Sequence, residues 1–290
     1  MRSKLFVPCS RPEFFAKALA GDADAISFDL EDSVPEGGKV QARARLIEFL
    51  ASDHARQSES GKRIIVRVNA LASPHFADDI AAIAVAGVDF INLPKAERAS
   101  DVQAAAAAID TAGCSSGRTE PTGLLVNIET PRALAHAAEI ACAHPIVAGL
   151  QAGLNDLFEP LEIDRTDLRH IHPPLWTIRL ASAQASCFAY DSAYADLGDE
   201  DGFRREAELA RGLGFLGKSC VHPKQVGIAN MVFDRPDTDL AAARRIVAAA
   251  QRAASEGKGA FLLDGRMIDQ PMIAHARAVL ANSDAAENRR

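Results

Sequence analysis

Short apolar segments rich in Val, Ile, Leu and Phe alternate along this chain with longer Ala-rich segments that have helical periodicity. Eight such apolar segments can be identified: LFVP from Leu5, AISFDL from Ala25, IIVRV from Ile64, FINLP from Phe90, GLLVNI from Gly123, IVAGL from Ile146, SCFAY from Ser186 and GKSCV from Gly217. They recur about every 30 residues, which is the length of a strand, a loop and a crossover helix in a parallel βαβ unit. Their nearly continuous hydrophobicity is typical of strands that are buried on both faces of a sheet.

The number of repeats predicts the fold class. Eight units favour an α/β protein of the (β/α)8 TIM-barrel type over an open doubly wound sheet, because eight strands close a barrel and no Gly-x-Gly-x-x-Gly turn follows the first strand. We expect a catalytic barrel domain over residues 1–235 and a C-terminal helical extension over residues 236–290. Its helices are expected from about Asp237 to Ala254 and from about Pro271 to Asn282. Since the barrel is already closed, the apolar face of the last helix should pack on a neighbouring subunit.

Composition narrows the possible functions. The chain has 290 residues, of which 48% are hydrophobic and 24% charged, and this is enough to bury the core of one large α/β domain. A formal net charge of −7 argues against a general nucleic-acid or anionic-membrane binder, which needs a surplus of Lys and Arg. Five scattered cysteines without CxxC spacing indicate neither a disulfide framework nor a zinc site. Without a recognisable signal peptide or membrane-spanning segment, we expect a cytoplasmic location.

Charged residues gather where the predicted strands end, which is the end at which barrel enzymes build their active sites. They are Asp29, Glu31 and Asp32 after the second strand, Arg67 in the third, Lys95 after the fourth, Glu129 after the fifth, and Asp156, with Asn155, after the sixth. Several carboxylates in one pocket repel one another unless a cation or proton lies among them. Because the ligands are oxygens only, Mg²⁺ is expected, with Mn²⁺ possible. Glu129 and Asp156 follow neighbouring strands, about 4.8 Å apart, and could both reach one ion.

Two residues offer a different chemistry. Lys95, at a strand end, could form an imine with a carbonyl substrate, and His222 in VHP could act as a base. The carboxylate set favours the metal route, and His222 is expected to support the loop after the eighth strand.

Two of the acidic residues also have a purely structural interpretation. For Asp29, a capping or packing role competes with a place in the site. Asp269, before Gln-Pro, also fits a simple helix N-cap.

The motifs resemble one family over almost the whole chain. They are RSKLFVPCSRPE, FDLEDSV, VRVN, LPKAE, NIETPRAL, GLNDL, GFLGKSCVHPKQV and LLDGRMIDQPMIAHA, in this order. Together they are similar to the citrate lyase beta-subunit-like CoA lyases, which include malyl-CoA and citramalyl-CoA lyases within the HpcH/HpaI aldolase group.

The resemblance implies a role for individual residues. Glu129 and Asp156 would bind Mg²⁺ directly, and Glu31 and Asp32 would hold the metal-bound waters. Arg67 would polarise the thioester carbonyl, and Asp269 would act as an acid in the active site of a neighbouring subunit. Arg2 and Arg11 would assist with the CoA phosphates.

The implied activity is that of a Mg²⁺-dependent carbon-carbon lyase. It would cleave a 3-hydroxyacyl-CoA, such as malyl-, citramalyl- or citryl-CoA, into acyl-CoA and an oxo acid, or form it from them. The resemblance also implies a homotrimer or a hexamer. Two alternatives stay open: an acyl-CoA thioesterase on the same scaffold, and the beta subunit of a multi-chain citrate lyase. The segment HIHPPLWTIRLASAQ departs from the family pattern, so the pocket wall near His172 to Arg179 is expected to differ and the acyl substrate stays open.

Overall fold

The computed structural model describes residues 1–52, 61–84, 88–116, 122–234, 237–255, 257 and 259–287. Its contacts divide the chain into two compact units, Met1–Phe233 and Asp234–Arg290. Each unit has apolar clusters of its own. Among the described residues, no helix combines the length and the apolar character that crossing a bilayer requires.

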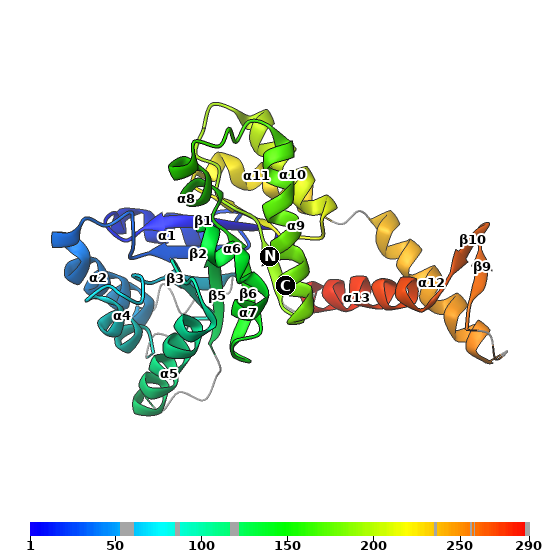
Figure 1. Ribbon diagram of the computed structural model, residues 1–290, viewed down its shortest axis with the longest axis horizontal. Helices are drawn as coiled ribbons and strands as arrows, with labels where there is room; N and C mark the ends of the chain where they lie inside the picture. The colour runs from blue at the N-terminus through cyan, green and yellow to red at the C-terminus, as the bar shows by residue number, and fades with distance from the viewer. Residues whose placement is uncertain are drawn as a thin grey trace. The chain divides into compact units, whose positions relative to one another are not determined.

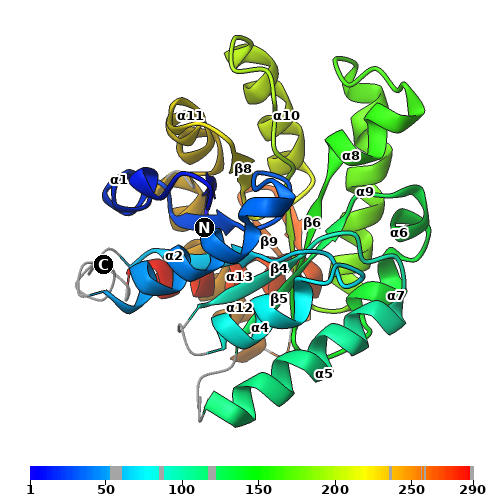
Figure 2. The ribbon, with the colours of Figure 1, turned by 90° about the vertical axis from the view of Figure 1, so that its left-hand side faces the viewer.

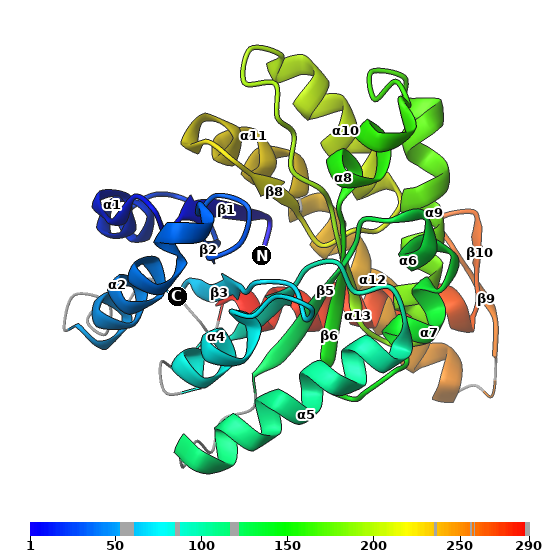
Figure 3. The ribbon, with the colours of Figure 1, turned by 60° about the vertical axis from the view of Figure 1, so that its left-hand side comes forward.

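Parallel strands form the barrel of the first unit (Figures 2 and 3). They are β1 (Ser3–Pro8), β2 (Ala25–Asp29), β3 (Arg63–Arg67), β4 (Phe90–Leu93), β5 (Gly123–Ile128), β6 (Val147–Ala152), β7 (Phe188–Tyr190) and β8 (Lys218–Cys220). Each strand from β1 to β6 pairs with the next one along the chain, and β8 pairs with β1. A parallel bridge between Asp191 and Lys218 joins the ends of β7 and β8. The predicted (β/α)8 class is therefore confirmed, and every predicted apolar segment overlaps one of these strands.

Helices surround this sheet (Figure 1). They are α1 (Phe15–Ala20), α2 (Lys39–Ala51), α4 (Phe76–Ile83), α5 (Ala99–Ser116), α6 (Pro131–Ala135), α7 (Ala137–Ala141), α8 (Leu154–Phe158), α9 (Leu168–Gln184), α10 (Glu200–Gly212) and α11 (Pro223–Phe233), with 3-10 turns η1 (Pro12–Phe14), η2 (Glu36–Gly38) and η3 (Glu159–Leu161). In the described part of the barrel, side-chain caps begin α6, α9 and α10. Thr130, Asp167 and Asp199 accept hydrogen bonds from the first turns of α6, α9 and α10.

The strands separate an apolar outer layer from a polar interior. In β2, Ile26 and Phe28 pack into the core between sheet and helices, so the alternate residue Ser27 faces the inside of the barrel. The interior also holds Asn92 of β4 and Asn127 of β5, and the side-chain amide of Asn92 donates to the side-chain oxygen of Asn127 at 2.7 Å. The alternation thus brings polar groups up to the strand ends.

Lys4 is the exceptional interior residue, because it is fully buried and the ion pairs found among the described residues do not include it. Its ammonium donates to Gln151 and lies 4.2 Å from the centroid of the Phe6 ring. Burial, and then the positive charge of Arg67, hold the pKa of Lys4 well below its ordinary value. The unfolded chain therefore binds this proton more readily, and the contribution of Lys4 to stability improves as pH rises towards the ordinary lysine range.

The second unit contains the two predicted helices, α12 (Asp237–Ser255) and α13 (Gln270–Glu287), which pack through Ala243, Ala276 and Val279. Between them lies an antiparallel hairpin of β9 (Phe261–Leu263) and β10 (Arg266–Ile268), visible in Figure 1. Only helices were expected in this extension, so the hairpin was not predicted. Asp264-Gly265, with φ of 51° and 77°, was the available signal, because Asp-Gly between apolar residues favours a tight hairpin turn.

Replacing the buried amine tests how much Lys4 lowers the stability of the fold. The double variant Lys4→Met/Gln151→Leu removes the amine and its partner together, so we expect equal or higher stability, by up to about 3 kcal/mol, and a weaker rise of stability with pH. Urea unfolding at several pH values measures both. The single variant Lys4→Met leaves Gln151 unpaired and should gain less. A large loss of stability in the double variant would show that the ammonium contributes to the fold.

Candidate active site

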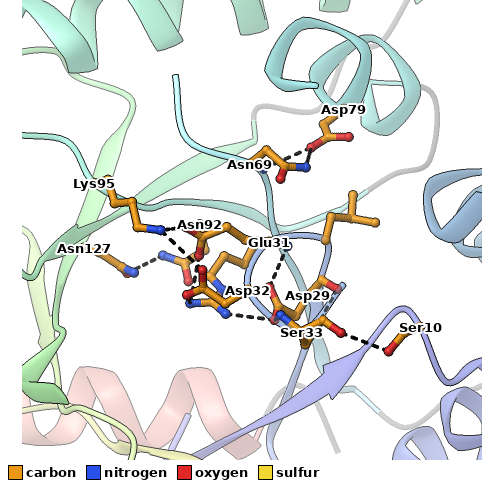
Figure 4. A network of polar contacts seen from close by, with 12 residues as sticks. Ser10, Asp29, Glu31, Asp32, Ser33, Asn69, Asp79, Asn92, Lys95 and Asn127 are labelled. Carbon is orange, nitrogen blue, oxygen red and sulfur yellow. Dashed lines mark hydrogen bonds and ion pairs between the residues drawn. The ribbon is translucent and has the colours of Figure 1, made fainter. Parts of the chain in front are cut away.

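The register of β2 and β3 brings the first pair of site residues together. Asp29 and Arg67 are the last residues of their strands and are direct neighbours in the parallel ladder. Both side chains therefore lie at the carboxyl end of the barrel and on the same face of the sheet. Glu31 and Asp32 follow in the loop after β2, and Figure 4 shows them beside Asp29 and Lys95.

Arg67 is the centre of this group. Its Nε and Nη2 donate to the two oxygens of Asp29 at 2.7 and 2.8 Å, while Nη1 lies 3.0 Å from Glu31 Oε2 and 3.5 Å from Asp32 Oδ2. Burial by itself raises the pKa of Asp29, but the Arg67 charge and the hydrogen bonds from Arg67, Ser33 and Glu31 together outweigh it and hold this pKa below its ordinary value. The guanidinium is thus locked in one plane by a bidentate ion pair.

Asp29 therefore anchors Arg67, a role that the sequence analysis left open between packing and the site. Its oxygens also accept hydrogen bonds from the backbone N–H groups of Glu31 at 3.0 Å and Ser33 at 3.1 Å. One carboxylate thereby fixes both the arginine and the loop that carries Glu31 and Asp32. Asp29 and Arg67 are each next to the last residue of consecutive predicted strands, but their pairing is fixed by the register of the sheet.

Lys95 enters the same cluster from the end of β4. Its ammonium lies 2.6 Å from Glu31 Oε1 and 3.3 Å from Asp32 Oδ1. Burial alone lowers the pKa of Lys95, but these ion pairs outweigh it and hold the pKa above its ordinary value. An imine requires the neutral amine, so these ion pairs argue against the imine reading.

Glu129 and Asp156 come from neighbouring strands. Glu129 directly follows β5, and Asp156 lies in α8 after β6. Glu129 Oε1 accepts the backbone N–H of Lys95 at 2.6 Å, and Oε2 accepts the side-chain amide of Asn127 at 2.9 Å. Gly153 permits the close approach of the two loops, because a Cβ there would overlap the Glu129 side chain and lie 2.8 Å from its Oε2.

The electrostatics of these two carboxylates suit a divalent cation. Burial, and then the negative charge of Asp156, raise the pKa of Glu129 to about 7. Burial and the charge of Asp32 likewise raise the pKa of Asp156. Within the described ranges, no three His, Cys, Asp or Glu side chains are arranged to hold a metal on their own. The pair fits a hard cation that takes one or two carboxylates and completes its shell with water or ligand oxygens, as Mg²⁺ does.

A buried ion cluster lies behind α8. Arg165 donates to Asn155, to both oxygens of Glu206 at 2.8 Å and to Ser192 Oγ at 2.9 Å. Glu206 also accepts from Lys218 at 2.9 Å, and Lys218 pairs with Asp191 at 2.7 Å. The cluster ties the helix that carries Asp156 to the end of the barrel where β7 meets β8. No motif in the sequence pointed to it.

A cavity of about 340 Å³ opens beside the cluster of Glu31, Asp32 and Lys95. Glu31, Asp32 and Lys95 form one part of its lining, and Asn69 and Ser73 form another. The segment from His172 to Arg179, which was expected to reshape the pocket wall, does not line this cavity. It lies in α9, where Leu175 and Ile178 are buried and Trp176 is exposed.

The structure places the other predicted residues elsewhere. Arg2 precedes β1 and therefore lies at the opposite, amino end of the barrel, where its guanidinium pairs with Asp24 at 3.0 Å. Arg11 follows β1 and pairs with the exposed Glu13. His222 Nδ1 accepts the backbone N–H of Lys224, in the loop after β8. Asp269, in the second unit, caps α13 by accepting the N–H of Met272 at 3.3 Å.

Comparison with known families agrees with this geometry. The model of the HpcH/HpaI aldolase/citrate lyase family matches residues 2–223. The chain belongs to this family. It is 33% identical to the L-malyl-CoA/beta-methylmalyl-CoA lyase of Cereibacter sphaeroides, over 98% of this chain and 94% of that protein. It is 36% identical to the citrate lyase subunit beta of Escherichia coli, over 98% and 93%.

Solved structures of this family are similar over most of the chain. The CitE protein of Mycobacterium tuberculosis in complex with magnesium, acetoacetate and coenzyme A has a TM-score of 0.72 at 33% identity, covering 97% of this chain and 98% of that one. The M. tuberculosis citrate lyase beta subunit with oxaloacetate and magnesium has a TM-score of 0.66 at 32% identity, covering 81% and 97%.

The raised pKa of Glu129 predicts how cation binding depends on pH. Below about 7 this carboxyl is protonated and must lose its proton to act as a ligand, so affinity for Mg²⁺ should tighten as pH rises to about 7 and then level off. Calorimetry in buffers of different ionisation enthalpy measures the affinity and the released proton. Glu129→Gln should weaken binding and abolish this pH dependence. The same affinity at pH 5.5 and 8 would contradict the assignment of Glu129.

Proposed function

We propose that this protein is a Mg²⁺-dependent carbon-carbon lyase that acts on a 3-hydroxyacyl-CoA such as malyl-, citramalyl- or citryl-CoA. Cleavage yields acyl-CoA and an oxo acid, and the reverse reaction condenses them. The observation that carries the proposal is the convergence of Glu129 and Asp156 beside the Arg67–Asp29 ion pair at the carboxyl end of the barrel. The malyl-CoA lyase relative, and the relatives solved with magnesium, coenzyme A and oxo acids, support it.

The two facing carboxylates would hold the metal ion. Glu129 and Asp156 would be its direct ligands, and Glu31 and Asp32 would bind the waters that surround it. When bound, Mg²⁺ supplies a Lewis acid for the carbonyl and carboxylate oxygens of the oxo acid. Asn127 and the backbone N–H of Lys95 orient Glu129 from the protein side.

Arg67 would stabilise the negative charge that develops on the thioester oxygen. In cleavage, the hydroxyl group loses its proton, the C–C bond breaks, and its electron pair passes to the acyl-CoA part as an enolate. Burial alone lowers the pKa of Arg67, but Asp29, Glu31 and Asp32 together outweigh it and raise the pKa above its ordinary value, so the guanidinium keeps its charge throughout. A fixed, charged donor at the developing oxyanion lowers the barrier because it requires no reorganisation.

Asp269 would return a proton to the enolate carbon, or remove it in condensation. We propose that it does so in the active site of a neighbouring subunit, within a cytoplasmic homotrimer or a hexamer formed from two trimers. In this arrangement residues 1–235 are the catalytic domain and residues 236–290 are the cap. The hairpin before Asp269 supports an intermolecular role, because Leu262 and Met267 are opposite each other in register and are 75% and 67% exposed.

The 36% identity to a citrate lyase beta subunit supports a second candidate function. In that case the protein would act only with partner chains, on acyl groups attached to a carrier. Activity of the purified chain on free CoA esters separates the two functions.

The decisive assay measures products. With Mg²⁺ and a panel of malyl-, citramalyl-, citryl- and other 3-hydroxyacyl-CoA esters, we expect acyl-CoA plus an oxo acid by mass spectrometry, and loss of activity with EDTA. Free CoA plus a hydroxy acid would instead establish the thioesterase alternative. No turnover without added citrate lyase subunits would favour the second candidate.

Substitutions separate metal binding from oxyanion stabilisation. Glu129→Ala and Asp156→Ala should lose Mg²⁺ binding together with turnover. Arg67→Lys should keep Mg²⁺ binding but lose turnover by about 100-fold or more, because lysine cannot reproduce the planar guanidinium donors. Calorimetry and initial rates give the two readouts. Normal Mg²⁺ affinity in both carboxylate variants would refute their assignment as ligands.

Subunit mixing tests the place of Asp269. Asp269→Asn keeps the helix cap and removes the acid, so it should fold normally and be inactive. Mixing it with inactive Arg67→Ala under conditions of subunit exchange should restore activity to about a quarter of the wild-type level, because random assembly completes about one site in four. Native mass spectrometry verifies the exchange. No recovery despite exchange would mean that Asp269 does not serve a neighbouring subunit.

A further inference from the structure

Lys95 has a backbone conformation that its side chain does not favour. Its φ is 55°, in the left-handed region that residues other than Gly, Asn and Asp seldom adopt. It comes two residues after the end of β4, immediately after Pro94. Such a conformation persists only where the surroundings hold it, and it is concentrated at functional sites.

This conformation lets one residue contact two groups of carboxylates. The backbone N–H donates to Glu129 Oε1 at 2.6 Å. The side chain reaches Glu31 Oε1 at 2.6 Å and Asp32 Oδ1 at 3.3 Å, as Figure 4 shows. Lys95 thus connects the carboxylate assigned as a direct metal ligand with the two assigned to the metal-bound waters.

The ammonium of Lys95 makes the charge of the site less negative. Five carboxylates contribute here: Asp29, Glu31, Asp32, Glu129 and Asp156. The cations paired with them in the described structure are Arg67, whose Nε and Nη2 are taken by Asp29, and Lys95. Removing the lysine charge therefore makes the site more negative without touching either direct ligand.

We propose that Lys95 is a positioning residue with two separable parts. Its backbone N–H orients Glu129, and its ammonium fixes Glu31 and Asp32 while it moderates the affinity of the site for the cation. This inference rests on the proposed function for the identity of the cation. It assigns the lysine a non-covalent role throughout.

The charge part is tested by Lys95→Met, which keeps the length of the side chain and removes its charge. Because a fixed cation near the site repels Mg²⁺, its loss should tighten Mg²⁺ binding by about threefold to tenfold while turnover falls. Lys95→Arg keeps the charge and should stay within about twofold of the wild-type Mg²⁺ affinity. A loop that had merely been disrupted would bind Mg²⁺ more weakly, which is the opposite sign. Unchanged or weaker binding by Lys95→Met would overturn the charge part.

The role of the backbone N–H is tested by two variants that both lack the positive charge of the lysine. Lys95→Asn tolerates the left-handed conformation and should match Lys95→Met in Mg²⁺ affinity. Lys95→Val is β-branched, resists this conformation and should draw the N–H away from Glu129, so its Mg²⁺ affinity should be clearly lower than that of Lys95→Asn. Equal affinities of Lys95→Asn and Lys95→Val would overturn the backbone part.

The control removes a cation outside the site. Arg132 in α6 pairs with Glu97 at 3.1 Å and is more than half exposed. At physiological ionic strength, Arg132→Met should leave Mg²⁺ affinity unchanged, because an exposed charge is screened there. All titrations are made on the intact protein with Mg²⁺ alone. If the wild type binds Mg²⁺ and cleaves none of the CoA esters, the proposed function fails while the role of Lys95 can still be measured.

Discussion

The mutual repulsion of five carboxylates at one end of the barrel is the constraint on which the site depends. Asp29 is neutralised by a bidentate guanidinium, and Glu31 and Asp32 share an ammonium. Within the described residues, no ion pair gives Glu129 or Asp156 such a cation, and burial together with the negative charge of Asp156 raises the pKa of Glu129 to about 7. The protein therefore satisfies three carboxylates internally and leaves a pair that favours an added charge.

The barrel supplies the geometry for this arrangement through its register. Asp29 meets Arg67 because the last residues of β2 and β3 are direct neighbours in the ladder, and Asn127 reaches Glu129 from two positions earlier along β5. Gly153 then lets the loop after β6 come close enough for Asp156 to act on Glu129. Each contact depends on alternation along a strand, so a one-residue slip in register would turn the polar set towards the apolar outer layer.

The sequence was sufficient for the barrel and for the position of the charged residues at its carboxyl end, because buried parallel strands have a clear hydrophobic pattern and barrel sites lie at known strand ends. It was insufficient for pairings across strands. Asp29 was ambiguous because its partner is fixed by register, and the contacts of Lys95 depend on a left-handed backbone that no local pattern announces. Arg2 precedes the first strand, so its position at the amino end of the barrel could be predicted from the sequence.

The Arg67–Asp29 pair also shows why a structural and a functional reading of a buried arginine need not compete. A guanidinium has five N–H donors, and Asp29 engages one on Nε and one on Nη2. The ion pair consumes part of the donor set and fixes the plane of the remainder. An arginine without this partner would lose both its orientation and the interaction that keeps it charged when buried. The structural ion pair is therefore the condition for a donor that is held in place before any substrate arrives.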